Sequence, residues 1–443
     1  MKKIQSCVLL FLCLVFPFQA SSYAASIAGR DILDNGITLL HSEKTVLPIV
    51  TVVVAIKAGS VAESPGKSGL ANLTADLLKE GTEGRSSKQI SDAIEFVGGS
   101  LSTSGGSDFI TVSLSVLKKD IELGFDLLSD VILNPAFRDD EIKRRKTSIK
   151  NSIIQQKEEP DVIASKAFYE AVFGKHPYGR PVEGTEETLD MITREDISSF
   201  HKEHYLPNNT IITVVGDISK TELNSLLERY FMNWRKKDSR ELLLPAPEFK
   251  DKPKVIKIQK TLTQANIILG HLGIKRDNPD YYAVSVMNYI LGGGGFASRL
   301  MDNIRDNKGL AYDVHSNFSA NKYSGSFQAG LQTKNESANT AIEEILKEME
   351  RIRTEQVSDK ELSDAKSYLT GSFPLRIDSN RKIAGFLTLV EFYGLGLDYV
   401  DNYRKFIEAV TKDDILRVAG KYLNTKNYVL IVVGDMETAA LKY

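Results

Sequence analysis

An internal repeat constrains the fold of this chain more than any other feature. The sequence TREDI at residues 193–197 recurs as TKDDI at 411–415, and VVGD at 214–217 recurs at 432–435. Both pairs are 218 residues apart (411 − 193 and 432 − 214). Two matches with one offset mean that a helix start, a strand end and the interval between them occur twice. The chain is therefore predicted to contain two homologous halves.

Strand patterns recur in both halves. Residues 49–57 (IVTVVVAIK) form a β-branched run typical of a buried strand. Apolar residues alternate with Thr and Ser in residues 109–117, and a similar alternation in 323–333 places Phe327 and Leu331 on one side. Such alternation is typical of antiparallel strands that bury one face.

Helical spacing is predicted for residues 86–97, 118–132, 139–156 and 194–205, and Pro160 is expected to close the third of these helices. Strands and helices of these lengths indicate an α+β fold. We predict two homologous domains, each a mainly antiparallel sheet covered by helices.

Composition and turn residues give the expected boundaries. Residues 1–24 are predicted to be a signal peptide, and residues 25–234 the N-terminal domain. Residues 235–253 are polar, contain three prolines and show no periodicity, so we interpret them as a linker. Residues 254–443 then form the C-terminal domain.

The signal-peptide prediction depends on the order of residue types at the N-terminus. Lys2 and Lys3 precede an apolar run at residues 8–18, and small residues follow, with cleavage expected after Ala24. The alternative is a membrane anchor, but the run is short against the roughly 20 apolar residues needed to span a bilayer. We expect an exported protein whose mature chain has no membrane span.

Charge and cysteine content exclude several classes of site in the mature chain. Cys7 and Cys13 both lie in the predicted signal peptide, so no thiol remains for a disulfide, a zinc site or catalysis. Without Lys2 and Lys3 the chain has 54 basic residues (56 − 2) against 58 acidic ones. This balance gives no reason to expect nucleic acid as a partner.

The stretch GLANLTADLLKEGT, residues 69–82, is predicted to be an amphipathic helix that follows a strand and a loop. Asn72 and Asp76 are one helical turn apart and share a face, as two metal ligands would. Zinc prefers imidazole or thiolate ligands and needs a nearby carboxylate to accept a proton from bound water. Ala75 cannot accept a proton. The spacing therefore fits a metal site, and the residue types do not.

Four stretches carry a resemblance to a known family. They are residues 69–82, HPYGRPVEGT at 176–185, PNNTIITVVGD at 207–217, and LGGGGFASRLMDNIRDNKGLAYDV at 291–314. In this order they resemble the signatures of the pitrilysin/insulinase family of zinc peptidases, also called inverzincins. The match extends from about residue 36 to residue 435, which is nearly the whole mature chain.

The resemblance implies that the zinc site of this chain is degenerate. Active members have His-x-x-Glu-His on the first helix and a glutamate ligand about 75 residues later. These positions fall on Asn72, Ala75, Asp76 and Ser152 of this sequence, and all four differ. Asn72 and Asp76 could hold a hard cation only loosely, because two oxygens make a poor cage. We expect no metal in this chain and a solvated Asp76 beside a cleft.

Histidines elsewhere were considered as replacement ligands. His201 and His204 lie three apart on a predicted helix, one residue short of the family motif, and are predicted to be structural or solvated. The remaining histidines, His41, His176, His271 and His315, are isolated in the sequence, and we expect structural roles for them.

Two residues of the second half match the family where the first half does not. Arg305 and Tyr312 correspond to an Arg/Tyr pair that, by resemblance, reaches a peptide substrate across the chamber. A guanidinium and a phenol can donate hydrogen bonds to a carbonyl and to its developing negative charge. The alternative is that Arg305 stabilises the C-terminus of its helix electrostatically and that Tyr312 packs in a strand.

The run of four glycines before Phe296 is predicted to be a turn into the Arg305 helix. No GK[ST] sequence follows it, which favours a turn over a phosphate-binding loop. The resemblance implies that Gly293 and Gly294 could touch substrate.

Together these features predict a non-catalytic, substrate-binding subunit of a heterodimeric zinc metallopeptidase. It would pair with a homologous HxxEH-bearing subunit, which holds the zinc, in the periplasm of a Gram-negative bacterium. The pair would enclose an unfolded peptide, with Arg305 and Tyr312 contributed to the partner's site. A proteolytically silent scaffold or peptide-binding protein is the alternative. An independent hydrolase is disfavoured because no nucleophile has a base beside it.

Overall fold

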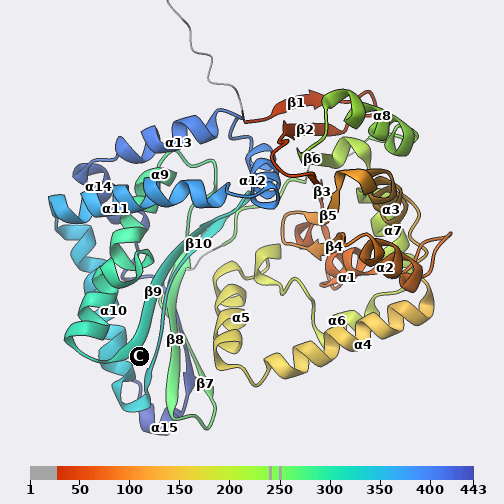
Figure 1. The fold of residues 1–443 in the computed structure, drawn as a ribbon. Helices are drawn as coiled ribbons and strands as arrows, with labels where there is room; N and C mark the ends of the chain where they lie inside the picture. The colour runs from red at the N-terminus through yellow and green to blue at the C-terminus, as the bar shows by residue number, and fades with distance from the viewer. Residues whose placement is uncertain (1–26, 239–241, 249–251) are drawn as a thin grey trace, which may run out of the picture.

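The computed structural model describes residues 27–238, 242–248 and 252–443 (Figure 1). The predicted signal peptide, residues 1–24, lies outside this range. The described part of the predicted linker, residues 235–253, contains neither helix nor strand. Within the described residues, no helix combines the length and the apolar character needed to cross a bilayer.

The first half contains a six-stranded sheet of order β1-β2-β6-β3-β5-β4. All neighbouring strands are antiparallel except β2 and β6. The strands are β1 (Gly29–Ile32), β2 (Thr38–Glu43), β3 (Ile49–Ile56), β4 (Ser100–Gly105), β5 (Ile110–Leu117) and β6 (Thr210–Gly216).

The second half contains a five-stranded sheet of order β7-β11-β8-β10-β9, in which only β7 and β11 are parallel. The strands are β7 (Lys254–Gln259), β8 (Gln264–Leu272), β9 (Ala311–Ala320), β10 (Gly325–Lys334) and β11 (Val429–Gly434). Apart from β1, the chain visits corresponding positions in the same order in both sheets. The predicted α+β fold with mainly antiparallel sheets is confirmed.

The repeated sequences have a local physical explanation. Thr193 and Thr411 each cap a helix, and Asp196 and Asp414, three residues later, bond back to the capping residue. These reciprocal bonds satisfy backbone groups that a helix start would otherwise leave unpaired. The repeated VVG then ends β6 and β11.

Helices fill the intervals between the strands. In the first half they are α1 (Leu70–Leu77), α2 (Ser87–Phe96), α3 (Ile121–Leu133), α4 (Asp139–Gln156), α5 (Pro160–Phe173), α6 (Glu186–Met191), α7 (Arg194–His204) and α8 (Lys220–Phe231). In the second half they are α9 (Tyr281–Asn288), α10 (Ala338–Thr354), α11 (Asp359–Ser372), α12 (Asn380–Phe392), α13 (Tyr399–Glu408), α14 (Lys412–Tyr422) and α15 (Met436–Ala439), together with the π-helical turns η5 (Tyr289–Gly293) and η7 (Met301–Asn307) and the 3-10 turn η6 (Gly295–Ala297).

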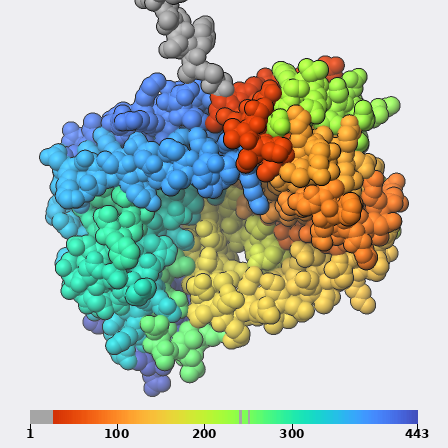
Figure 2. All heavy atoms as spheres, viewed as in Figure 1, coloured from red at the N-terminus to blue at the C-terminus, as the bar shows by residue number. Residues whose placement is uncertain are grey.

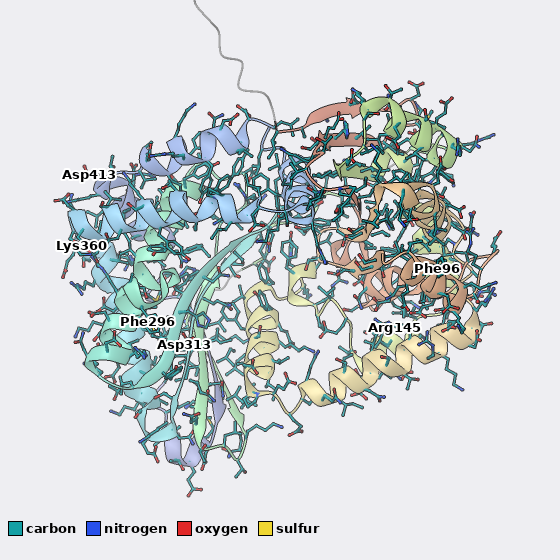
Figure 3. The ribbon with its side chains drawn as sticks, in the orientation of Figure 1. Phe96, Arg145, Phe296, Asp313, Lys360 and Asp413 are labelled. Carbon is teal, nitrogen blue, oxygen red and sulfur yellow. The ribbon has the colours of Figure 1, made fainter. Side chains whose placement is uncertain are left out.

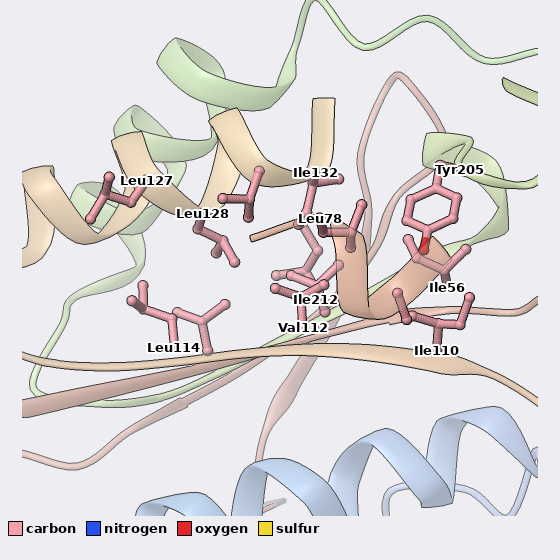
Figure 4. Close-up of a cluster of buried hydrophobic side chains, with 14 of the residues drawn as sticks. Ile56, Leu78, Ile110, Val112, Leu114, Leu127, Leu128, Ile132, Tyr205 and Ile212 are labelled. Atoms are coloured by element: carbon pink, nitrogen blue, oxygen red, sulfur yellow. The ribbon is translucent and has the colours of Figure 1, made fainter. Parts of the chain in front are cut away.

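Each half has its own main core on one face of its sheet. In the first half, Val112 and Leu114 of β5 lie in one buried cluster with Leu127 and Leu128 of α3 (Figure 4). The alternation predicted for residues 109–117 thus sends the apolar side chains toward the helices. A corresponding cluster in the second half includes Phe327 of β10.

The opposite face of each sheet is covered by a helix from the other half. Leu387 of α12 packs with Val53 and Ile211 of the first sheet, and Phe168 of α5 packs with Ile431 of the second. Figure 1 shows α12 beside β3 and β6, and α5 beside the second sheet. The two halves therefore exchange one helix each.

The exchanged helix α5 corrects one detail of the sequence prediction. The helix at residues 139–156 ends where expected, but Pro160 begins α5. Proline suits the first position of a helix, because the amide hydrogen that it lacks would have no partner there. The apolar residues of α5 do not form one stripe, which hid the helix from a periodicity search.

Candidate functional site

Helix α1 occupies the place predicted for a catalytic helix. It begins after Gly69, which has a φ of 97° and lies against the Glu183 carbonyl, where a Cβ would come within 2.7 Å. Glu63 supports the same end, because its Oε1 accepts hydrogen bonds from the Gly69 and Ala71 amides at 3.1 and 2.9 Å. A carboxyl oxygen at this position accepts hydrogen bonds from amides that the helix start would otherwise leave free.

The three α1 positions of interest face the interior to different degrees. Asn72 is half-buried, and β4 approaches it closely because Gly105 has no side chain. Ala75 is fully buried, and Asp76 is only 8% exposed. The prediction that Asp76 is solvated is therefore wrong.

Asp76 is instead paired with a cation from another helix. Its Oδ2 accepts hydrogen bonds from Arg145 Nη2 at 2.7 Å and Nε at 2.9 Å. Arg145 lies on α4 beside α1 (Figure 3). Both donors of this fork meet one carboxylate oxygen, so the charge that would attract a metal is already matched by a guanidinium.

The surroundings of this pair are largely dry. Burial raises the pKa of Asp76, and the hydrogen bonds from Arg145 oppose that rise. The phenol of Tyr205 is buried nearby, and its pKa is raised first by burial and then by the Asp76 charge. A neutral tyrosine and a paired aspartate leave little net charge in this wall.

The fourth predicted position, Ser152, does not join the others. It is exposed on α4, two helical turns beyond Arg145, or roughly 10 Å along the axis. Among the residues that the structure describes, no group of three or more His, Asp or Glu side chains is placed to hold a metal.

The histidines have structural partners. His201 bonds through Nε2 to the Ile132 carbonyl at 2.8 Å, and burial lowers its pKa to about 4. His204 packs against Phe200, with the rings tilted by 53° and their centroids 4.5 Å apart. His41 and His271 are buried and bond to backbone carbonyls.

His176 and His315 differ from each other. The Nδ1 of His176 accepts a hydrogen bond from the Tyr178 amide at 3.2 Å and caps the turn that follows. His315 is exposed on β9 and lies 3.1 Å from Asp313. Neither contact is part of a metal-ligand cluster.

The glycine run of the second half joins two helical turns. Gly292 lies against β9, where a Cβ would come within 2.6 Å of the Ser316 amide nitrogen. Gly293 is exposed and Gly294 partly exposed at the end of η5. The run therefore lets a helix end approach a strand before the chain enters η7.

Arg305 and Tyr312 come together at this place. Arg305 lies in the last turn of η7, and Tyr312 lies near the start of edge strand β9, with its ring centroid 5.5 Å from the guanidinium carbon. Tyr312 is 86% exposed, so it does not pack in the strand as the alternative interpretation required. Arg305 also bonds to Asp306 at 2.6 Å, which leaves other guanidinium donors for a ligand.

Phe296 is a third member of this group that the sequence analysis did not identify. Its ring lies 4.9 Å from the Arg305 guanidinium and is 71% exposed (Figure 3). Arg305 is thus within cation–π distance of two exposed aromatic rings. Such contacts restrain a long, flexible side chain while its N–H groups can still donate hydrogen bonds.

Arg145 was also missed, for a different reason. It lies in the charged stretch DDEIKRRK, and only the packing of α4 selects it over Arg144, which bonds to Glu80 and Glu141. For the group formed by Phe296, Arg305 and Tyr312, the sequence offered one signal, which is the position of Phe296 directly after the glycines.

Each half of the chain matches a model of the same peptidase family. Residues 39–186 match the family described as insulinase (peptidase family M16), and residues 191–369 match the peptidase M16 inactive domain. Uncharacterized zinc proteases of Bacillus subtilis and Rickettsia felis are both 27% identical to this chain, over 78% and 89% of its length and 83% and 94% of theirs.

Solved structures agree with the fold. The structure described as a peptidase M16 inactive domain from Pseudomonas fluorescens superposes with a TM-score of 0.86 at 29% identity, covering 92% of this chain and 98% of that one. A protease from Helicobacter pylori superposes with a TM-score of 0.85 at 20% identity, covering 92% and 99%.

Proposed function

Because this chain is a homologue of the zinc proteases of the insulinase family, peptidase family M16, we propose that it is the non-catalytic, substrate-binding subunit of a heterodimeric zinc metallopeptidase. Its partner would be a homologue with an intact HxxEH motif. The observation that carries the proposal is the contrast between a neutralised α1 wall and the pair formed by a partly exposed Arg305 and an exposed Tyr312.

The α1 wall argues against metal chemistry in this chain. Ala75 offers no base, and Asp76 already binds Arg145. A divalent cation approaching Asp76 would meet the guanidinium at close range in a partly dry site, where like charges repel strongly. These residues do not fit a zinc ion, so the zinc and its activated water would have to be supplied by the partner.

The second half offers hydrogen-bond donors for a peptide, which the α1 wall lacks. Arg305 and Tyr312 present N–H and O–H donors at the surface, where a peptide held by another chain can reach them. They would bind the carbonyl next to the scissile bond and stabilise the negative charge that develops on its oxygen. The peptide would be unfolded, so that its carbonyls are free to accept these bonds.

The cellular location is part of the proposal. The N-terminal pattern of Lys2, Lys3 and an apolar run supports export to the periplasm of a Gram-negative bacterium. The partner would have to be exported with it.

The proposal is tested by searching the neighbouring reading frames for an HxxEH-bearing homologue and mixing that protein with the purified chain. We expect association by size exclusion, one zinc-bearing subunit per pair, and cleavage of a quenched fluorescent peptide by the mixture only. This chain alone should be inactive with or without added zinc. If the two proteins do not associate, or if the mixture is no more active than the homologue alone, the proposal is wrong.

A second candidate is a proteolytically silent scaffold or peptide-binding protein. The replacement of all four zinc positions favours it equally. It makes no use of Arg305, so Arg305→Ala would leave every activity of the complex unchanged.

A further inference from the structure

A cavity of about 690 Å³ opens between α5 and the loop that follows it. Its wall includes residues of α4 and α5, the loop at residues 178–187, and Ser319 and Asn321 from the end of β9 and the turn beyond it. Figure 2 shows that the yellow part of the chain, which contains α4 and α5, borders a hollow in the middle of the molecule. The volume lies within the range of small-ligand sites.

The lining is mixed in a way that suits a peptide. Ile163, Tyr169, Phe173 and Val182 give apolar walls. Hydroxyl and amide groups also line the cavity and can pair with a peptide backbone; they come from Ser107, Gln156, Ser319 and Asn321. Gln156 and Ser319 already bond to Lys166 and Ser326, so Ser107 and Asn321 are the groups that a purely hydrocarbon ligand would cover without offering a partner.

Most charges in the lining are already matched. Lys157 pairs with Glu186 at 2.6 Å, and Lys166 pairs with Glu183 at 2.7 Å. Two further acids, Glu170 and Glu187, are exposed to solvent at the rim. The lysines therefore offer little attraction to an incoming anion.

Arg180 is the exception. Its Nε is buried and has no hydrogen-bond partner among the described residues, and its Nη2 makes only a 3.5 Å contact with the Ser60 carbonyl. A buried guanidinium donor without an acceptor is costly, because it has lost water and gained nothing in return.

Glu63 is an acid that interacts electrostatically with Arg180, but its hydrogen bonds go to the start of α1. Glu63 is 5% exposed and uses Oε1 on the amides of α1, while its Oε2 has no partner among the described residues. Burial raises the pKa of Glu63 to about 8 although Arg180 lowers it. Glu63 therefore makes no hydrogen bond to Arg180, and its raised pKa weakens the negative charge that could offset the guanidinium.

We propose that this cavity binds the C-terminal carboxylate of a peptide with an apolar last residue. Arg180 would take the carboxylate, and Tyr169 and Phe173 would contact the terminal side chain. Guanidinium and carboxylate match in charge and in their planar geometry. The site needs neither a zinc-bearing partner nor Arg305, so it stands independently of the function proposed above.

The test is fluorescence anisotropy with the purified chain alone and a short N-terminally labelled peptide that ends in Phe. We expect the free acid to bind roughly tenfold or more tightly than its C-terminal amide, because the amide cannot form a charge-assisted bond. An amidated peptide with Asp as its last side chain separates a terminal carboxylate from an acidic side chain. It is expected to bind like the neutral amide.

Variants identify the site. Arg180→Gln should remove the preference for the free acid, whereas Arg381→Gln, at an exposed arginine of α12, should keep it. Val182→Trp should fill the cavity and abolish binding of both peptides, with an unchanged melting temperature. Val182→Trp tests whether the peptide binds in this cavity even if Arg180→Gln does not fold.

Three results would overturn the proposal: equal binding of acid and amide, an unchanged preference in Arg180→Gln, or full binding by folded Val182→Trp. Binding of dodecanoate without binding of the peptide acid would also contradict it.

Discussion

The two halves share a strand order but differ in the segment that precedes their edge strands. In the first half, α1 is a regular helix whose Ala75 and Asp76 are buried and whose charge is matched by Arg145. In the second, a glycine turn leads to Phe296, Arg305 and Tyr312, whose aromatic rings are exposed. One fold thus supports a closed wall in one copy and an accessible donor group in the other.

The largest expected effect tests what the halves have in common. Phe168→Ala in α5 should cost about 3–5 kcal/mol of unfolding free energy, and Leu387→Ala in α12 about 2–5 kcal/mol, because each side chain is fully buried against the other half's sheet. Urea unfolding followed by circular dichroism measures both.

The exposed Leu375 provides the control, and Leu375→Ala should change stability little. Losses below about 1 kcal/mol in both core variants would mean that the exchanged helices are not part of a shared core.

The next effect tests the difference between the halves. In the heterodimer, Arg305→Ala should lower turnover on the order of 100-fold, because it removes a donor to transition-state charge, while zinc content and assembly stay unchanged. Steady-state cleavage and metal analysis of the same preparation measure this. Arg381→Ala is the matched control, and unchanged turnover in Arg305→Ala would favour the scaffold alternative.

A smaller effect contrasts two carboxyl groups at helix starts. Glu63 lies at α1, where burial raises its pKa to about 8. Asp280 lies at α9, where burial opposes ionisation but hydrogen bonds from Tyr422, Lys421 and Arg417 lower its pKa to about 2. The contribution of Glu63 to the free energy of unfolding is full below pH 4.5 and is lost as the pH rises through 8. The contribution of Asp280 is full above pH 3.8 and is lost as the pH falls through 2.

The free energy of unfolding of the wild type should therefore fall by about 1.4 kcal/mol per pH unit between roughly pH 5 and pH 7.5, and Glu63→Gln should abolish this fall. Urea unfolding at a series of pH values measures the slope. Glu95→Gln, at an exposed position of α2, should leave it unchanged. The same slope in wild type and Glu63→Gln would show that Glu63 is ionised in the folded protein.

The smallest effect concerns the ring beside Arg305. Phe296→Ala should lower heterodimer turnover about two- to fivefold, the value of an exposed cation–π contact. Phe96→Ala removes a ring of the first half that is even more open to solvent (Figure 3) and should have no effect. Equal turnover in the two variants would show that Arg305 needs no support from Phe296.

The sequence predicted features that depend on local pattern. The repeat predicted two halves, and the alternation at residues 109–117 predicted which side chains of β5 are buried. It also placed Arg305 seven residues before Tyr312, and the turn between them brings the two side chains together. Each of these depends on residues that are close in the chain or on a period that the chain itself displays.

The features that were missed depend on contacts between distant segments. Asp76 was expected in solvent because nothing near it in sequence reveals Arg145, which is 69 residues away. Helix α5 was missed because its apolar residues meet both the second sheet and the cavity, so no single stripe forms. The unpartnered Nε of Arg180 is likewise a product of packing.

The exchange of α5 and α12 also has a mechanical consequence. A hinge between two domains requires an interface that can open, and apolar helices buried in the opposite half resist that motion. This chain should therefore move as one rigid shell. If this chain encloses a peptide together with a partner, as proposed above, the opening that admits the peptide would have to lie at the contact between the two chains.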